Sequence, residues 1–348
     1  MPRGGAFTGK GFHERIISLP NLISAWSEFK KGKLKKQDVG HFALNAEEEI
    51  FALSHDLAQG DYRHSGYTHF VICDPKRRSV HKACVRDRLL HHAIFRVLEP
   101  IFDRGFICDS FSSRKGKGTH KAHERFRQFA WKLSRNNMRT VWTLKCDVRK
   151  FFDSVDHHVL LGLLAKKVDQ VTHSLLREIV TSFETSPGKG IPIGNLTSQL
   201  FSNIYLNEFD HFVKRTLRVK HYIRYADDFV LLSISREELI SVVPLLQAFL
   251  NEQLTLKIHP DKIIIRKWRQ GVDFLGYVMF PFHQVMRTKT KKRMLRKLYR
   301  RSQRASRGLI SSYSFTQSMQ SYLGILTHCR AKSIEKKLRL IERSAKVG

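Results

Sequence analysis

The sequence predicts a mixed α+β fold, because its apolar residues follow strand spacing in some segments and helix spacing in others. The strongest strand signal is residues 222–232, an otherwise apolar run with the adjacent acids Asp227 and Asp228 at its centre. A second predicted strand, residues 141–148, alternates between apolar and polar side chains and carries Asp147 near its end. Helix spacing dominates the two ends of the chain.

Two helices are expected in the N-terminal segment. The first follows Asn21 and has apolar residues at helical spacing: Leu22, Ala25, Trp26 and Phe29. The second follows Asn45, which forms a capping-box pattern with Glu48. Its apolar stripe consists of Ile50, Leu53 and Leu57.

The next segment contains one short strand, one helix and one loop. Residues 70–73 predict the strand, and residues 74–78 predict a basic turn after it. Residues 85–98 have a helical pattern that is expected to stop at Pro100. Residues 112–119 combine basic side chains with two glycines. They predict either a solvated loop or, beside a metal site, a loop that binds template or phosphate.

Helices alternate with strands through the rest of the chain. Further helical elements are expected near residues 155–164, 174–183, 196–206 and 239–254. A loop is expected at 188–194, and a pair of strands begins at 271. The last 65 residues are rich in Lys and Arg and predict a small basic helical bundle. Its first helix carries a narrow apolar stripe of Met294, Leu295, Leu298 and Tyr299.

The charge balance indicates a polyanionic partner. The chain of 348 residues has 62 Lys and Arg against 31 Asp and Glu, a formal charge of +31. Such an excess repels itself in an isolated protein, and nucleic acid is the commonest polyanion that relieves it. The alternative is a generally basic protein or one that binds a membrane surface.

No sequence feature predicts membrane insertion or secretion. No apolar run approaches the length of a membrane span, and the first residues lack the apolar core of a signal peptide. The five cysteines are scattered, and no C-x-x-C pair occurs, so neither a disulfide framework nor a zinc ribbon is expected. We therefore expect a cytoplasmic protein.

The acids predict a metal site. A strand that turns at Asp227 and Asp228 places both carboxylates at the tip of a hairpin, where burial without a cation is costly. Mg²⁺ prefers a few carboxylates, waters and substrate phosphates. Asp147 on a second strand supplies the convergence that two-metal phosphoryl transfer needs. The alternative for Asp147 is an exposed acid at a strand end.

The order of these motifs resembles the reverse transcriptases. Residues 145–153 (Lys-Cys-Asp-Val-Arg-Lys-Phe-Phe-Asp) resemble the first catalytic motif, and residues 225–228 (Tyr-Ala-Asp-Asp) match the second. Residues 271–277 resemble the primer-grip hairpin, and residues 85–88 resemble a fingers motif of the group II intron-like branch. The resemblance covers about residues 60–330.

This resemblance implies a right-hand polymerase that makes DNA on an RNA template. Residues 1–140 would form an N-terminal extension and the fingers with part of the palm. Residues 141–282 would form the palm, including a motif loop at 188–206, and residues 283–348 a basic helical thumb. Asp147, Asp227 and Asp228 would be catalytic. With the carbonyl of Val148, they would bind two Mg²⁺ ions, for which Mn²⁺ is a substitute.

The resemblance also assigns residues to the incoming dNTP. Phe152 matches the aromatic residue that excludes a ribose 2′-OH. Arg78 matches the fingers arginine that holds the triphosphate, since its guanidinium suits phosphate oxygens. Lys76 and Arg114 are further candidates in that region. Lys262 matches the lysine proposed to protonate pyrophosphate, and its alternative is a solvated surface lysine.

One motif departs from the general family pattern. Many reverse transcriptases have Gln-Gly in the loop beside the nascent base pair, whereas Ile193 precedes Gly194 here. With Ser198 and Gln199, this form resembles the reverse transcriptases of diversity-generating retroelements. Those enzymes copy a template-repeat RNA, misincorporate opposite adenines and thereby diversify a variable gene. Neutral drift within a group II-like enzyme is the alternative explanation of Ile193.

Two further groups of residues are expected to contact nucleic acid. The primer grip would consist of Phe274, Leu275, Gly276 and Tyr277. The thumb residues expected on the nucleic-acid backbone are Lys291, Lys292, Arg296 and Arg300.

The resemblance implies template RNA, primer and cDNA, dNTPs and a small basic accessory variability protein that forms a pentameric ring as partners. The protein would be encoded by a bacterium or a phage. No RNase H, endonuclease or maturase segment is expected after the thumb, so partners would supply those functions. The alternatives are a retron, phage-defence or group II intron-like reverse transcriptase, or a non-catalytic RNA-binding scaffold.

Overall fold

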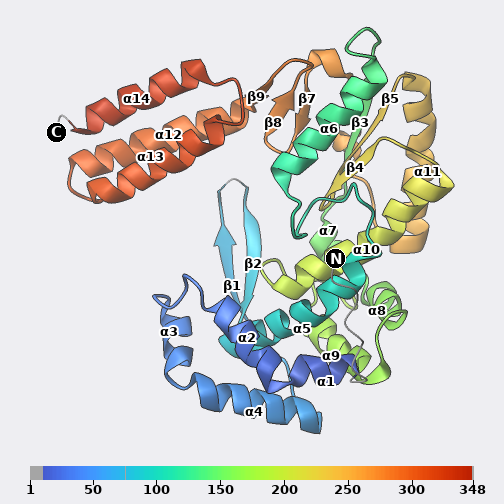
Figure 1. The fold of residues 1–348 in the computed structure, drawn as a ribbon, viewed down its shortest axis with the longest axis vertical. Helices are drawn as coiled ribbons and strands as arrows, with labels where there is room; N and C mark the ends of the chain where they lie inside the picture. Colours follow the sequence, from blue (N-terminus) through green and yellow to red (C-terminus); the bar gives the residue numbers. More distant parts are fainter. Residues whose placement is uncertain (1–10, 75, 347–348) are drawn as a thin grey trace, which may run out of the picture. The chain divides into compact units, whose positions relative to one another are not determined.

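The computed structural model describes residues 11–74 and 76–346, which form two compact units. The first unit contains the described residues up to Gly118, together with 146–229 and 242–263. The second unit contains residues 119–145 and 230–241 and the described residues from Ile264 onward. The predicted mixture of helices and strands is confirmed (Figure 1). The predicted fingers, palm and thumb have other boundaries than these two units, and that three-part division stays a prediction.

The N-terminal part of the first unit is helical and carries a β-hairpin. Its helices are α1 (Phe12–Ile17), α2 (Leu19–Phe29), α3 (Gln37–Leu44), α4 (Ala46–Gln59) and α5 (Val85–Asp103). The hairpin consists of β1 (Tyr67–Ile72) and β2 (Arg78–Ala83), which pair antiparallel. The four apolar residues predicted on the first helix are all buried in α2.

Two local predictions in this part are wrong. Asn45 precedes α4, but its side chain makes no capping hydrogen bond. Helix α5 continues past Pro100 to its end at Asp103. The proline removes one amide donor in the last turn of the helix, while burial of Leu98 and Phe102 on either side of it stabilises the helical path.

The rest of the first unit is mainly helical and includes one complete strand. It contains α7 (Phe151–Ser154), α8 (His157–Ala165), α9 (Gln170–Thr181), α10 (Leu196–His211), the π-helical segment η1 (Phe212–Thr216), β4 (Tyr222–Tyr225) and the 3₁₀ segment η2 (Pro260–Lys262). Most residues of α10 are buried. This helix therefore forms the core beside β4.

Three elements contain residues of both units: β3 (Trp142–Asp147), β5 (Asp228–Ser233) and α11 (Arg236–Leu254). The strand order in the central sheet is β4-β5-β3-β6, where β6 is Ile264–Lys267. Strands β4 and β5 are neighbours joined by a turn at Ala226 and Asp227, which confirms the predicted hairpin.

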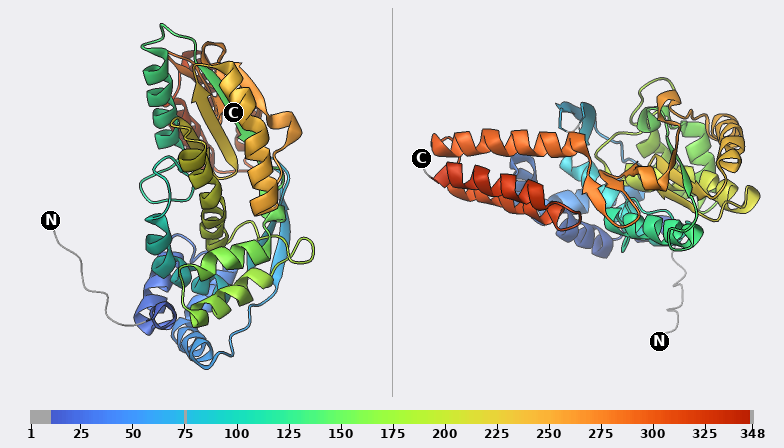
Figure 2. Two further views of the ribbon diagram at one scale, coloured as in Figure 1. Left: turned by 90° about the vertical axis from the view of Figure 1, so that its right-hand side faces the viewer. Right: turned by 90° about the horizontal axis from the view of Figure 1, so that it is seen from above.

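The second unit contains a small sheet and the C-terminal bundle. Its other elements are α6 (Thr119–Ser134), the 3₁₀ segment η3 (Trp268–Gln270), β7 (Val272–Phe274), β8 (Tyr277–Met279), β9 (Gln284–Met286), α12 (Thr288–Ser306), α13 (Ser312–Leu326) and α14 (Lys332–Lys346). The right-hand view of Figure 2 shows α12, α13 and α14 side by side. The predicted bundle is confirmed, and Met294 and Leu298 lie in its core. Tyr299, predicted on the same stripe, is instead exposed.

Among the residues that the structure describes, no helix is both long enough and apolar enough to span a bilayer.

Candidate active site

The three predicted catalytic acids lie in the first unit at the ends of two neighbouring strands. Asp147 is the last residue of β3, and Asp228 is the first residue of β5. Asp227 lies in the turn between β4 and β5. The amide of Val148 donates to the carbonyl of Asp227 over 3.2 Å, so the main chain after β3 is bonded directly to this turn.

Asp227 is in an unfavourable environment for a carboxylate. Burial raises the pKa of Asp227 to about 6, and the neighbouring charges of Asp147 and Asp228 add to the effect. The positive charge of Lys262 lowers that pKa and offsets part of the increase. The turn therefore concentrates negative charge that a cation would relieve.

Lys262 forms an ion pair with Asp147, with its Nζ 2.6 Å from Asp147 Oδ1. It is the last residue of η2. The same segment is bonded to β3 through the amide of His259, which donates to the carbonyl of Asp147 over 2.9 Å. The lysine predicted near the leaving group thus lies beside one of the three acids predicted to be catalytic.

The acids fit a divalent cation by donor chemistry, but they do not form a complete cage. Across the described residues, no group of three or more His, Cys, Asp and Glu side chains is arranged to hold a metal ion. Carboxylate oxygens are the ligands that Mg²⁺ prefers, and it usually completes its shell with waters and substrate phosphates. Asp147, Asp227 and Asp228 therefore suit a cation that arrives with a nucleotide.

A main-chain hydrogen bond links Phe152 to the motif loop. Lys150 precedes α7 in the left-handed conformation (φ +46°), which turns the chain after β3. The amide of Ile191 donates to the carbonyl of Phe152 over 2.8 Å. The residue predicted to exclude the 2′-OH is therefore bonded to the loop predicted to influence fidelity.

The motif loop also contacts β2. The amide of His81 donates to the carbonyl of Ile193 over 3.3 Å. Gly194 has φ +120°, and a Cβ at this position would lie 3.1 Å from Val80 Cγ1. Ser198 is buried in the first turn of α10, whereas Gln199 is exposed. The loop therefore has a glycine that both its backbone angle and its contact with β2 require.

The residues predicted to bind the triphosphate differ in whether their side chains are exposed or already bonded to the protein. Lys76 and Arg78 are exposed at the β1–β2 hairpin. Arg114 is almost buried, pairs with Asp103 through Nε (2.5 Å) and Nη2 (3.1 Å), and donates to the carbonyls of Ile107 and Ser110. Four of its five donors are directed to the protein, which leaves the Arg114 guanidinium poorly placed to bind the predicted triphosphate.

The predicted primer-grip residues form a tight hairpin in the second unit. Phe274 pairs with Tyr277 across β7 and β8. Leu275 and Gly276 form the turn, with φ +47° and +91°. The hydroxyl of Tyr277 donates to the carbonyl of Ile325 over 3.0 Å, which connects this hairpin to α13.

The predicted backbone-binding residues lie on α12 in the same unit. Lys292, Arg296 and Arg300 are exposed and spaced by four residues, so they share one face of the helix. Lys291 is only half exposed.

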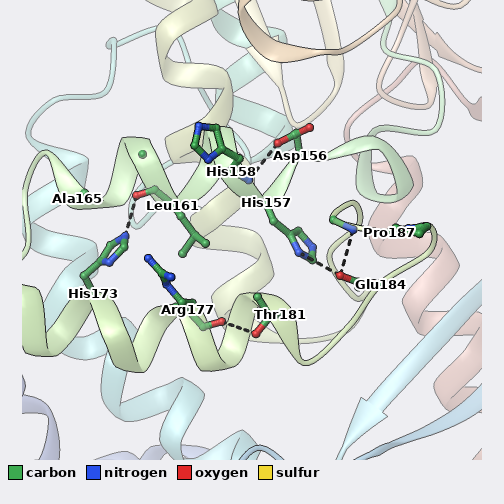
Figure 3. Close-up of a pocket in the computed structure, with 12 residues that line it drawn as sticks. Asp156, His157, His158, Leu161, Ala165, His173, Arg177, Thr181, Glu184 and Pro187 are labelled. Carbon is green, nitrogen blue, oxygen red and sulfur yellow. Dashed lines mark hydrogen bonds and ion pairs between the residues drawn. The ribbon is translucent and has the colours of Figure 1, made fainter.

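A cavity lies elsewhere in the first unit. It has a volume of about 580 Å³ and lies between α8 and α9 (Figure 3). His157, His173 and Arg177 line it, and the Nδ1 atom of His157 lies 3.9 Å from the carboxylate of Glu184. None of its lining residues is a predicted site residue. We therefore locate the chemistry at the acids and not in this cavity.

A buried polar network beside the turn that carries Asp227 was not predicted from the sequence. Arg224 on β4 is fully buried and forms an ion pair with Asp210 of α10 at 2.7 Å. Tyr222 donates to the same carboxylate over 2.7 Å. A charged residue between Ile223 and Tyr225 in a strand pattern was the available signal.

Comparison with known proteins adds the family and the fold. The family model described as reverse transcriptase (RNA-dependent DNA polymerase) matches residues 74–279. YkfC of Escherichia coli is 25% identical over 271 residues, which cover 66% of this chain and 70% of YkfC. The group II intron-encoded protein LtrA of Lactococcus lactis is 22% identical over 333 residues, which cover 75% of this chain. The chain spans 54% of the length of LtrA.

Two solved structures share the fold. Apo telomerase from Candida tropicalis aligns with a TM-score of 0.51 at 11% identity, covering 87% of this chain and 68% of that one. Telomerase from Candida tropicalis with a fragment of telomeric RNA aligns with a TM-score of 0.50 at 12% identity, covering 81% and 53%. The fold is that of a right-hand polymerase. Because the family model matches more than half of the sequence, this chain belongs to the reverse transcriptase family of RNA-dependent DNA polymerases.

Proposed function

We propose that this chain extends a DNA primer by copying an RNA template with dNTPs. The observation that carries the proposal is the grouping of Asp147, Asp227 and Lys262, in which two acids and a lysine from three distant segments interact. The primer 3′-OH would attack the α-phosphorus of the dNTP, and the bond between that phosphorus and the bridging oxygen would break. Pyrophosphate would leave.

Different residues of this chain would have separate roles in this reaction. Asp147, Asp227, Asp228 and the Val148 carbonyl would hold divalent ions, proposed as two Mg²⁺ with Mn²⁺ as a substitute. Such ions lower the pKa of an attacking hydroxyl and neutralise phosphate charge.

Lys262 would donate a proton to an oxygen of the leaving pyrophosphate. Arg78 and Lys76 are exposed on the hairpin and would bind the triphosphate, and Phe152 would exclude the 2′-OH.

Primer extension on an RNA template tests this proposal. The wild type should extend the primer with dNTPs, and Asp227→Ala should abolish extension while the protein remains folded. Asp61→Ala, which removes an exposed acid elsewhere in the first unit, is the matched control. If the wild type bound RNA without extending any primer, the non-catalytic scaffold would be the better description. If Asp227→Ala retained extension, Asp227 would not be catalytic.

We further propose that the enzyme belongs to the diversity-generating type. The support is the sequence Ile-Gly at 193–194, because a branched hydrocarbon replaces the hydrogen-bonding side chain expected beside the nascent base pair. A small basic accessory protein that forms a pentameric ring would then be a partner. The similarity to LtrA favours a second candidate, a group II intron-like enzyme.

Sequencing of cDNA made from one defined RNA distinguishes the two candidates. A diversity-generating enzyme should misincorporate mainly opposite adenines, whereas errors spread evenly over the four bases would favour the group II-like candidate. Flanking DNA gives an independent answer, because imperfect repeats that differ at adenines are expected only for the first candidate.

A further inference from the structure

The buried network behind the catalytic turn centres on Arg224. Its Nε and Nη2 atoms donate to the two oxygens of Asp210 over 2.8 and 2.7 Å. Burial opposes the charge of Arg224, but attraction to Asp210 outweighs it, so the pKa of Arg224 lies above its ordinary value. A bidentate pair of this kind fixes the direction of the guanidinium plane.

The remaining nitrogen of Arg224 reaches the turn that carries Asp227. Nη1 donates to the carbonyl of Ala226 over 3.1 Å. Ala226 has φ +54°, a left-handed conformation that a residue with a side chain adopts only where its surroundings hold it. The hydrogen bond from Arg224 therefore acts on a strained position of the turn.

The two peptide groups that flank Asp227 are both held. Arg224 fixes the carbonyl of Ala226, which belongs to the peptide group before Asp227. The amide of Val148 fixes the carbonyl of Asp227, which belongs to the peptide group after it. The orientation of these two planes sets φ and ψ of Asp227 and hence the direction in which its carboxylate leaves the main chain.

The same network extends to α10 and to the loop before α6. Nη1 of Arg224 also donates to the side-chain oxygen of Asn203 over 3.3 Å, and the amide group of Asn203 donates to the carbonyl of Ser112 over 2.9 Å. The main chain of Arg224 is bonded on both sides to the same loop: its amide donates to the carbonyl of Asp109, and its carbonyl accepts from Phe111. Arg224 thus connects the loop, α10 and the catalytic turn through hydrogen bonds of its main chain and its side chain.

We propose that Arg224 is a positioning residue for the catalytic turn. Through the carbonyl of Ala226 it holds Asp227 in the orientation that catalysis and divalent-ion binding need, and Asp210 holds Arg224. This inference rests on the proposed polymerase function, in which Asp227 is catalytic. If Arg224 had a purely structural role, its substitution would lower the stability of the protein and leave the turn of the folded protein unchanged.

Arg224→Lys is the first test, because lysine retains the charge but cannot bond both Asp210 oxygens and the Ala226 carbonyl together. We expect kcat to fall by about 10- to 100-fold, with a change of KM for dNTP of only about threefold or less. Two readouts do not need turnover. Mn²⁺ should bind more weakly, and the amide of Val148 should exchange faster with deuterated solvent.

Two further variants keep the test decisive. Leu53→Ala removes a buried side chain from α4 and serves as a control for lost stability, compared at equal folded fraction. The double variant Arg224→Gln with Asp210→Asn removes both buried charges, and glutamine is too short to replace the guanidinium. It decides the question if Arg224→Lys does not fold.

The proposal is overturned if the folded Arg224 variants match the wild type in kcat, Mn²⁺ affinity and exchange of Val148, or if Leu53→Ala reproduces their defects. Failure of the proposed function would look different. The wild type would then extend no primer, while Mn²⁺ binding and amide exchange would still report whether Arg224 holds the turn.

Discussion

Lys262 and Asp147 form an ion pair of 2.6 Å between residues that are 115 positions apart in the sequence. The lysine lies next to an acid to which the proposed chemistry assigns a divalent cation. The ammonium group and the cation would therefore compete for the carboxylate of Asp147. Lys262 can pair with Asp147 before the nucleotide binds and become available to the leaving group afterwards.

Lys262→Met should separate these two roles. At pH 8 we expect Mn²⁺ to bind more tightly by about three- to tenfold, because a positive charge beside the site is removed. In contrast, kcat should fall, because the proposed proton donor to pyrophosphate is removed. Titration with Mn²⁺ and single-nucleotide extension measure the two effects. Lys257→Met, an exposed lysine on the segment before η2, should change neither; unchanged Mn²⁺ affinity in Lys262→Met would contradict the competition.

Asp227 should make stability depend on pH. Burial, with Asp147 and Asp228, raises the pKa of Asp227 to about 6, whereas an unfolded aspartate has a pKa of about 3.9. Between these values the folded protein holds a proton that the unfolded chain has released. The contribution of Asp227 to the free energy of unfolding is therefore lost as pH rises from about 4 to 6.

Asp227→Asn should accordingly stabilise the protein at pH 8 without divalent ions, by about 3 kcal/mol. The gain should vanish near pH 3, below both pKa values, where the aspartate is protonated in both states. Urea unfolding in a chelator at both pH values checks this, with Asp61→Asn as the exposed control. A stability change that is the same at both pH values would show that ionisation of Asp227 is not its cause.

Local patterns predicted the strands and the acids, because period-two alternation and an acidic turn are visible in the sequence alone. Asp147 and Asp228 do fall at the ends of neighbouring strands, and Asp227 lies in the adjoining turn. The direction of a long cationic side chain is not encoded locally. Arg114 turns inward to Asp103, although its glycine-containing loop suggests a phosphate contact. Arg224 is likewise explained only by Asp210, which tertiary packing brings to it.

Gly194→Ala should destabilise the protein by about 1–3 kcal/mol, because φ +120° is strained for alanine and the new Cβ would lie 3.1 Å from Val80 Cγ1. The KM for dNTP should rise as the bond between Ile193 and His81 is disturbed. Gly162→Ala is the matched control, since it has open space and a helical position, and it should stabilise by about 0.5–1 kcal/mol. Equal stability of both variants would contradict this account.

Ile193→Gln should lower misincorporation opposite adenine if Ile193 loosens the nascent base pair. Glutamine restores a side chain that can donate and accept hydrogen bonds at this position. Its main-chain bond to His81 does not involve the side chain, so the loop should keep its conformation. Sequencing of cDNA from both proteins measures the change. An unchanged error spectrum would exclude Ile193 from fidelity.

The exposed face of α12 should carry much of the salt dependence of binding to an RNA–DNA duplex. Helix α12 contains no acidic residue, whereas α14 contains Glu335 and Glu342. Each lost phosphate contact reduces the slope of log K against log salt by about 0.9 on B-form DNA. Replacing Lys292, Arg296 and Arg300 with glutamine should therefore reduce the slope by about 2–3.

A triple variant on α14 distinguishes contact from net charge. Lys336, Lys337 and Arg339 are also exposed, and their replacement with glutamine removes the same three charges from the same unit. If α12 contacts phosphates directly, the α14 variant should change the slope by less than about 1, because its lysines and arginine act only through the long-range field. Equal slopes for the two variants would mean that the excess positive charge, and not the α12 face, controls binding to the duplex.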